Sequence, residues 1–204
     1  MKHLSRFALC GVVVCGMLGA APRVAAQAPM VTATGPMLEA NGGFEYIGQQ
    51  VPSQGSRVPM YGVNGGLTSG VTKHLSIRLD VAYARAGNVF SSGHPSDILS
   101  YMAGPVIYPV RTSRISPYAQ ILLGGARVTG ATPDGQGGYI RGYANEFAWA
   151  GGGGFEIRTS REFALRIGAD YMHTSYWDPN FALAGQGNIR GVVSFTYFLD
   201  GRRR

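Results

Sequence analysis

The sequence predicts an all-β protein whose eight antiparallel strands close into an up-and-down transmembrane β-barrel. Three observations predict this fold: long segments in which apolar and polar residues alternate, connections that alternate between short and long, and charges of both signs on the polar face of the strands. Residues 75–83 show the alternation most clearly. Because successive side chains on a strand point to opposite faces, one face of this segment is aliphatic and aromatic, and the other carries an arginine and an aspartate.

The first residues are expected to be a signal peptide. Lys2 and Arg6 precede an apolar run over residues 7–21, and the small residues at 24–26 resemble a cleavage site. The alternative, an N-terminal anchor helix, needs roughly 18 apolar residues, more than this run provides. The predicted organisation is a signal peptide at 1–26, a short N-terminal segment at 27–36, the barrel at 37–199 and a basic C-terminal tail at 200–204.

Composition favours a β-rich chain and excludes several functional classes. The 204 residues include 31 glycines and 11% aromatic residues, which is typical of an all-β protein. Three of the 18 basic residues lie before residue 27, which leaves 15 basic against 11 acidic residues, a net charge of +4. This charge is too small and too dispersed for a nucleic-acid-binding surface. Cys10 and Cys15 also lie before residue 27, so neither a disulfide nor a thiolate metal site is expected.

The alternating segments are long enough to cross a membrane. A tilted membrane strand takes roughly 9–11 residues, whereas strands of soluble proteins average roughly 5–6. The eight segments fall near residues 38–47, 59–71, 75–86, 98–109, 117–129, 146–157, 162–173 and 188–199.

The connections between these segments alternate in length. Short ones fall at 72–74, 111–116 and 158–161, and long ones rich in Gly, Pro, Ser, Asn and Asp fall at 49–58, 87–97, 130–145 and 174–187. Outer-membrane barrels combine short periplasmic turns with longer external loops. The pattern therefore predicts that both termini and the short turns face the periplasm.

Parity along the strands separates two sets of residues. The expected outer set is Phe44, Tyr46, Tyr61, Val63, Leu67, Leu75, Ile77, Leu79, Val81, Tyr83, Phe147, Trp149, Phe155, Phe163, Leu165, Ile167, Tyr171, Ile189, Val193, Phe195, Tyr197 and Leu199. The opposite set is Glu39, Asn41, Glu45, Asn64, Thr68, Arg78, Asp80, Glu156, Arg166, Asp170, Arg190 and Thr196. The segments near 98–109 and 117–129 are ambiguous, because both of their faces are mostly apolar.

The charged set decides which solvent surrounds the barrel. In a secreted soluble carrier of the lipocalin type the apolar set would fill the interior, but eight strands enclose too little space for so many aromatic side chains. The favoured interpretation places the apolar set in lipid and the charges in the lumen, where opposite charges offset the cost of burial. An ion-pair network, rather than a conduit, is expected from Glu45, Arg78, Asp80, Glu156, Arg166, Asp170 and Arg190.

The chain resembles the small outer-membrane β-barrels, similar to the OmpA transmembrane domain and the porin-like opacity-type proteins. The resembling features are the signal peptide, the Gly-Gly-Phe-Glu-Tyr sequence at 42–46, the Gly65-Gly66 strand, the Ala-Asp-Tyr-Met-His-Thr sequence at 169–174 and the last strand at 188–199. The resemblance implies a location in the bacterial outer membrane, contact with its lipids and lipopolysaccharide, and recognition of the last strand by the barrel-assembly machinery. This chain departs from the family by ending in Asp200, Gly201 and three arginines instead of an aromatic residue.

His173 and Ser175 suggest one enzymatic alternative. Both are expected to project outward at the external end of the seventh strand, an arrangement that resembles the His-x-Ser of outer-membrane lipid A deacylases. Nucleophilic catalysis needs a third group to orient the base, and the nearest acid is Asp178 in a loop. Tyr176 replaces the asparagine of that family, so an interfacial histidine and serine are the simpler interpretation.

The leading hypothesis is a monomeric, non-enzymatic barrel without cofactor or metal, and without a nucleic-acid partner. It would support the envelope or act through its external loops, which carry function in many proteins. Basic residues of the short turns are expected at the periplasmic rim, where they would attract anionic headgroups: Lys73, Arg111, Arg114, Arg158 and Arg161.

Overall fold

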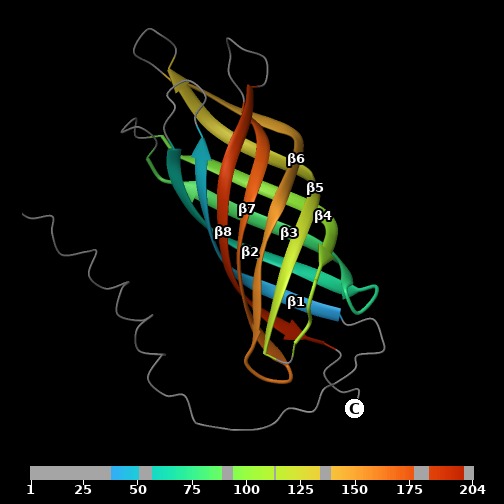
Figure 1. The fold of residues 1–204 in the computed structure, drawn as a ribbon. Helices are drawn as coiled ribbons and strands as arrows, with labels where there is room; N and C mark the ends of the chain where they lie inside the picture. Colours follow the sequence, from blue (N-terminus) through green and yellow to red (C-terminus); the bar gives the residue numbers. More distant parts are fainter. Residues whose placement is uncertain are drawn as a thin grey trace, which may run out of the picture. The chain divides into compact units, whose positions relative to one another are not determined.

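A computed structural model describes residues 38–50, 57–88, 94–112, 114–133, 139–176 and 184–199 of the chain. These residues form a closed antiparallel β-barrel in which each strand pairs with its neighbours in sequence and β1 pairs with β8 (Figure 1). The predicted fold is therefore confirmed. None of the described residues forms a helix that is long and apolar enough to cross a membrane. The predicted signal peptide, the segment at 27–36 and the basic tail at 200–204 lie outside the described residues.

The strands agree with the eight predicted segments, with differences at their ends. They are β1 (Leu38–Gln50), β2 (Arg57–Gly70), β3 (Leu75–Ala86), β4 (Ser96–Ile107), β5 (Ile115–Pro133), β6 (Tyr139–Arg158), β7 (Phe163–Tyr176) and β8 (Ala184–Phe198).

The strands are staggered as well as paired. A path from Leu75 through successive paired positions on β4 to β8, β1 and β2 returns to β3 at Arg85, ten residues further along. Closure with such a stagger requires the strands to tilt by about 35–45° from the barrel axis. At this tilt, a strand segment of about ten residues rises roughly 25 Å along the barrel axis. This is the height of the apolar band of a membrane barrel.

The two faces of the wall follow the predicted parity. Phe44 is 73% exposed, while the next residue, Glu45, is 4% exposed. All twelve residues of the predicted inner set are buried, and the predicted outer set is exposed or half-buried. The aromatic and aliphatic side chains therefore cover the outside of the barrel, which is the reverse of a lipocalin-type carrier.

The structure assigns the faces of β4 and β5, which the sequence left open. Leu99, Tyr101 and Leu123 point outward, whereas Met102 and Leu122 are buried in the lumen. Both faces of these strands read as apolar because this part of the lumen is itself apolar.

Strands β5 and β6 are longer than predicted, with 19 and 20 residues. Their pairing continues to Pro133 and Tyr139, so the prediction of a long loop at 130–145 is wrong for most of that stretch. Residues that favour strands extend the ladder: Thr129 and Thr132 on β5, and Tyr139, Ile140 and Tyr143 on β6. Within the described residues, β6 pairs with β7 only from Trp149 onward. Beyond that point β5 and β6 pair only with each other and form a two-stranded ribbon.

Two glycines in the wall let neighbouring atoms lie where a Cβ atom would otherwise be. A Cβ atom at Gly152 would lie 2.6 Å from the Cα of Asp170 on β7. A Cβ atom at Gly168 would collide with the hydroxyl of Tyr118, which crosses the lumen from β5. Strand glycines commonly mark such close contacts, and here they make room for the inward side chains described next.

Candidate functional site

Arg190 in β8 is the centre of a buried ion cluster in the lumen. Its Nη2 and Nε donate to Asp170 Oδ2 at 2.7 and 3.1 Å, and its Nη1 donates to Asp80 Oδ1 at 2.8 Å. Glu45 is more distant, with Oε2 4.0 Å from Nη1. The four side chains come from β8, β7, β3 and β1, so the cluster connects opposite parts of the wall.

Gln120 in β5 links a second arginine to this cluster. Its Nε2 lies 3.0 Å from both carboxylate oxygens of Asp170, and its Oε1 accepts a hydrogen bond from Arg78 Nη1 at 2.7 Å. Arg78 Nε also donates to Thr68 Oγ1 at 3.3 Å. Among the described residues, the charge of Arg78 therefore reaches a carboxylate through a neutral amide and not through a direct ion pair.

Arg166 in β7 is the centre of a second cluster, nearer the short turns. Its Nη2 lies 2.6 Å from Glu156 Oε2 and 3.3 Å from Glu39 Oε2, and it donates to the Tyr108 hydroxyl at 2.6 Å. Tyr108 follows β4 in the turn, where burial beside Glu156 and Glu39 raises the pKa of its phenol well above the usual range. The phenol therefore stays protonated and donates to Glu156 Oε2 at 3.4 Å.

Tyr118 lies between the two clusters. The centre of its ring is 5.8 Å from the guanidinium carbon of Arg78 and 5.2 Å from that of Arg166. The Tyr108 ring is 6.2 Å away. Cations over aromatic faces at such distances are attracted by the ring quadrupole, so an aromatic layer joins the two ion clusters.

The basic residues predicted at the periplasmic rim separate into two kinds. Lys73, Arg114 and Arg161 are exposed in the turns. The Arg158 guanidinium lies 4.5 Å from the centre of the Phe198 ring. Arg111 instead turns into the mouth of the barrel: its guanidinium lies 4.0 Å from the centre of the Tyr108 ring, with Nη2 3.2 Å from Ser76 Oγ and 3.9 Å from Glu39 Oε1.

The seven residues predicted to form one lumen network thus lie in two clusters. The first cluster contains Glu45, Asp80, Asp170 and Arg190 in direct contact, with Arg78 joined through Gln120. The second cluster, nearer the short turns, contains Glu156 and Arg166. Sequence reasoning did not select Tyr108, Tyr118 or Gln120 for the network. Tyr108 lies on the same face as Val106, so it could have been found once the inward face of β4 was known. The sequence did not reveal that face, because β4 and β5 carry no inward charge.

The half of the lumen farther from the short turns, called the external half below, is built differently. It is filled by an apolar cluster comprising Ile47, Val58, Met60, Ala84, Ala86, Ile98, Met102, Leu122, Ala126, Val128, Ala148, Ala150 and Met172, all at most 7% exposed. A polar layer closes this cluster toward the external end. There the Thr174 hydroxyl accepts from Asn188 Nδ2 at 2.9 Å and donates to Gln186 Oε1 at 3.3 Å, and Gln49 Nε2 donates to the same Gln186 oxygen at 3.4 Å.

His173 and Ser175 lie on the outer surface of β7 and are half-buried. The His173 ring stacks on Trp149, with ring centres 6.0 Å apart, and no hydrogen bond joins it to Ser175 among the described residues. Asp178, the acid that the enzymatic alternative requires, lies outside the described residues. Within the described ranges, no group of three or more His, Cys, Asp or Glu residues could hold a metal ion.

A sequence model of the outer membrane protein β-barrel domain family matches residues 11–195. The chain belongs to this family. No curated protein sequence matches it.

Solved structures of other outer membrane barrels share this fold. Neisserial surface protein A has a TM-score of 0.60 at 10% identity over 80% of this chain and 97% of that chain. Ail of Yersinia pestis, solved with the heparin analogue sucrose octasulfate, has a TM-score of 0.56 at 15% identity over 81% and 99%. OprG of Pseudomonas aeruginosa has a TM-score of 0.51 at 13% identity over 81% and 96%. At such identities the likeness concerns the fold alone.

As an outer membrane protein β-barrel, the chain is located in the bacterial outer membrane. Its short turns then face the periplasm. Six exposed aromatic residues form an external girdle on the outer face, as Tyr and Trp do at the interfaces of such barrels. They are Tyr46, Tyr61, Tyr83, Tyr101, Trp149 and Tyr171. Two pairs within this girdle, Tyr46 with Tyr61 and Trp149 with Tyr171, have ring centres 5.6 Å apart.

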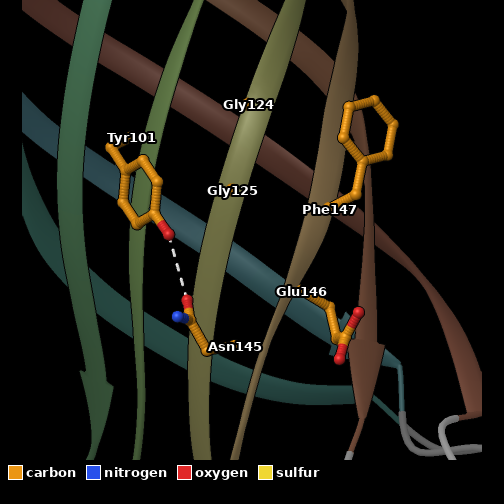
Figure 2. A pocket seen from close by; sticks show the side chains of 6 residues that line it. All are labelled: Tyr101, Gly124, Gly125, Asn145, Glu146 and Phe147. Carbon is orange, nitrogen blue, oxygen red and sulfur yellow. Dashed lines mark hydrogen bonds between the residues drawn. The ribbon is translucent and has the colours of Figure 1, made fainter.

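The outer face of this outer membrane barrel carries two shallow hollows near the girdle, which sequence reasoning did not identify. The first, the Gly125 hollow, is about 340 Å³ and is lined by Tyr101, Gly124, Gly125, Asn145, Glu146 and Phe147 (Figure 2). The Tyr101 hydroxyl donates to Asn145 Oδ1 at 3.0 Å, the dashed line in Figure 2. The second, the Arg127 hollow, is about 350 Å³ and is lined by Tyr83, Asp97, Leu99, Arg127 and Thr129.

Proposed function

We propose that this outer membrane barrel is non-enzymatic and that it supports the envelope or interacts with external surfaces, using a closed barrel as the anchor. The packing of the lumen carries this proposal. Buried side chains from all eight strands meet there, in two ion clusters, an apolar cluster and a polar layer. An eight-stranded interior is just wide enough for side chains to fill, and this one is occupied along its length.

The β5–β6 ribbon is the external part best suited to make contacts. Its arms remain paired from Thr129 and Tyr143 out to Pro133 and Tyr139, beyond the last pair of β4 with β5. A paired ribbon loses less conformational entropy on binding than an open loop of equal length. The ribbon is therefore a stiff extension through which the barrel could reach an external partner.

Two further features of the proposal concern assembly. A barrel that closes on itself leaves no strand edge within its wall, which supports a monomer. The pairing of β8 with β1 completes the closure, which supports a role for β8 in recognition by the barrel-assembly machinery. Lipids of the outer membrane, including lipopolysaccharide, would contact the apolar outer face.

Conductance measurements test the closed lumen. The purified mature protein, reconstituted into planar lipid bilayers, is expected to leave the steady current at the level of the bare bilayer. The matched variant Arg190→Ala removes the central cation of the Arg190 ion cluster. It serves to show that the assay can detect a disturbed lumen. Steady single-channel steps from the unmodified protein would contradict the proposal.

Shortening the ribbon tests the external role. Residues 131–141 are replaced by Asn-Gly, a sequence suited to a two-residue hairpin turn, between Gly130 and Gly142, which are paired. Cells lacking the protein are supplied with the full or the shortened chain, and their detergent resistance and attachment to surfaces are measured. If the shortened chain loses attachment but keeps detergent resistance, the ribbon makes the external contacts. If it keeps both properties, the barrel itself is responsible for them. The proposal fails if the full chain restores neither property.

No contact among the described residues favours the lipid A deacylase. The His173→Ala variant provides its test, since an enzyme would lose its effect on lipid A acyl chains, measured by mass spectrometry. An unchanged acyl pattern between the variant and the unmodified protein removes this alternative.

A further inference from the structure

We propose that the Arg127 hollow binds the phosphorylated sugar headgroup of an outer-leaflet glycolipid. The inference concerns the lipid-facing surface and does not depend on the role proposed for the ribbon. It starts from the position of Arg127 on β5. Gly125 is paired with Tyr101 of the external girdle, and Arg127 lies two residues further toward the external end. This position is where the membrane passes from acyl chains to headgroups.

Arg127 is held with its guanidinium available at this level. The guanidinium carbon lies 4.6 Å from the centre of the Tyr143 ring on the neighbouring strand β6. Tyr143 is 60% exposed, so the pair lies at the surface. Among the described residues, no hydrogen bond or ion pair involves the Arg127 guanidinium. Its donors are therefore free for an external acceptor, and a guanidinium suits the oxygens of a phosphate.

The other residues of the hollow indicate what the phosphate is attached to. Asp97 and Thr129 are paired across β4 and β5 and lie on the external side of Arg127. A carboxylate in an anion site favours a ligand that also brings hydrogen-bond donors, because the carboxylate only accepts. Sugar hydroxyls supply such donors. Asp97 and Thr129 therefore favour a phosphorylated sugar over a bare phosphate group.

The surface below the hollow suits the acyl part of the same molecule. Leu99 and Tyr83 are paired on β4 and β3 and form its membrane-side lining. The Gly125 hollow lies next to it, since Gly125 precedes Arg127 by two residues and Phe147 pairs with Gly125 (Figure 2). The Asn145 side chain adds polar atoms at its external side, while Phe147 faces lipid. Polar and apolar recognition thus follow one another along the barrel axis, as in an amphiphilic ligand.

A binding experiment with the folded mature protein tests this inference. Native mass spectrometry from detergent micelles measures affinity for lipid A, for lipid A with its phosphates removed, and for phosphatidylglycerol. Arg127→Gln is expected to weaken lipid A binding roughly five- to tenfold, because one charge-assisted contact near a membrane surface is lost. Dephosphorylated lipid A should bind more weakly to the unmodified protein and should not distinguish it from Arg127→Gln.

Arg57→Gln is the matched control. Arg57 is also exposed near the external end of the barrel, on β2, but its Nη1 donates to the Gly48 carbonyl at 3.2 Å and it lines neither hollow. Gel mobility with and without boiling verifies that both variants are folded. An equal loss of lipid A binding in Arg57→Gln would overturn the proposal, because only general charge attraction would then remain. Equal affinity for phosphatidylglycerol, with the same loss in Arg127→Gln, would overturn the choice of a glycolipid.

Discussion

The two halves of the lumen are both filled by side chains, but one half is ionic and the other is apolar. In the periplasmic half, five carboxylates and three buried arginines meet through direct ion pairs and through Gln120. In the external half, methionine, leucine, isoleucine and alanine fill the same cross-section. The outer surface of both halves is covered by apolar side chains. In a small barrel the lipid-facing side therefore constrains the sequence uniformly, while the interior can be either ionic or apolar.

The two halves should respond differently to the loss of one side chain. Arg190→Met is expected to have the largest effect, lowering the free energy of unfolding by about 3–5 kcal/mol, because Asp80, Asp170 and Glu45 remain buried without their cation. Urea unfolding in lipid vesicles measures this. Adding Asp80→Asn and Asp170→Asn should recover much of the loss. If it does not, the arginine contributes by packing and the ionic half resembles the apolar one.

In the apolar half, Leu122→Ala should cost about 3 kcal/mol, because it removes buried methyl groups and leaves a cavity that the wall cannot close. Leu123→Ala is the control, since that neighbouring side chain faces outward and lipid can occupy the vacated space. The same unfolding measurement applies. Equal losses at the two positions would show that the interior is no more tightly packed than the lipid boundary.

The polar layer at the external end should be less sensitive than either cluster. Thr174→Val removes the hydroxyl that accepts from Asn188 and donates to Gln186, and should lower the free energy of unfolding by about 1–2 kcal/mol. Ser175→Val, on the outward face beside it, is expected to leave stability almost unchanged. A larger loss at Ser175 would mean that the outer surface makes the contacts attributed to the lumen.

The smallest effect is expected at the periplasmic rim. Arg158→Met makes the same chemical change as Arg190→Met but removes only a half-exposed cation over the Phe198 ring, which is worth about 0.5 kcal/mol. Both variants are compared in one unfolding series. A loss near that of Arg190→Met would contradict the distinction between arginines buried among carboxylates and arginines at the rim.

The same contrast explains how much could be predicted from the sequence. Where inward positions are charged, as at Arg78, Asp80 and Arg166, alternation with apolar residues fixes the face of every neighbour. The parity of β1, β3, β6, β7 and β8 was therefore predictable, and the inward Asn64 and Thr68 did the same for β2. Where Ile98, Met102 and Leu122 point inward, both faces read alike, and only pairing with adjacent strands determines the orientation.

Other features depend on reach and on pairing partners. Arg111 lies in a turn, and sequence position alone placed it at the rim, yet its long side chain enters the mouth and meets Glu39 and Tyr108. The separation of the predicted network into two clusters follows from the stagger, which sets the heights at which residues from distant strands meet. The extension of β5 and β6 was missed because glycine and proline in 130–145 suggested a loop, although strand-favouring residues lie among them.

Closure between β1 and β8 also has a consequence for biogenesis. Glu39 pairs with Phe198, from opposite ends of the barrel sequence, so the first strand has no second neighbour until the last one has been synthesised. Contacts between such distant residues form slowly, and until then both terminal strands offer unpaired backbone to other chains. We therefore expect the unfolded chain to depend on a holding chaperone during transit, and a version truncated before β8 to aggregate rather than insert.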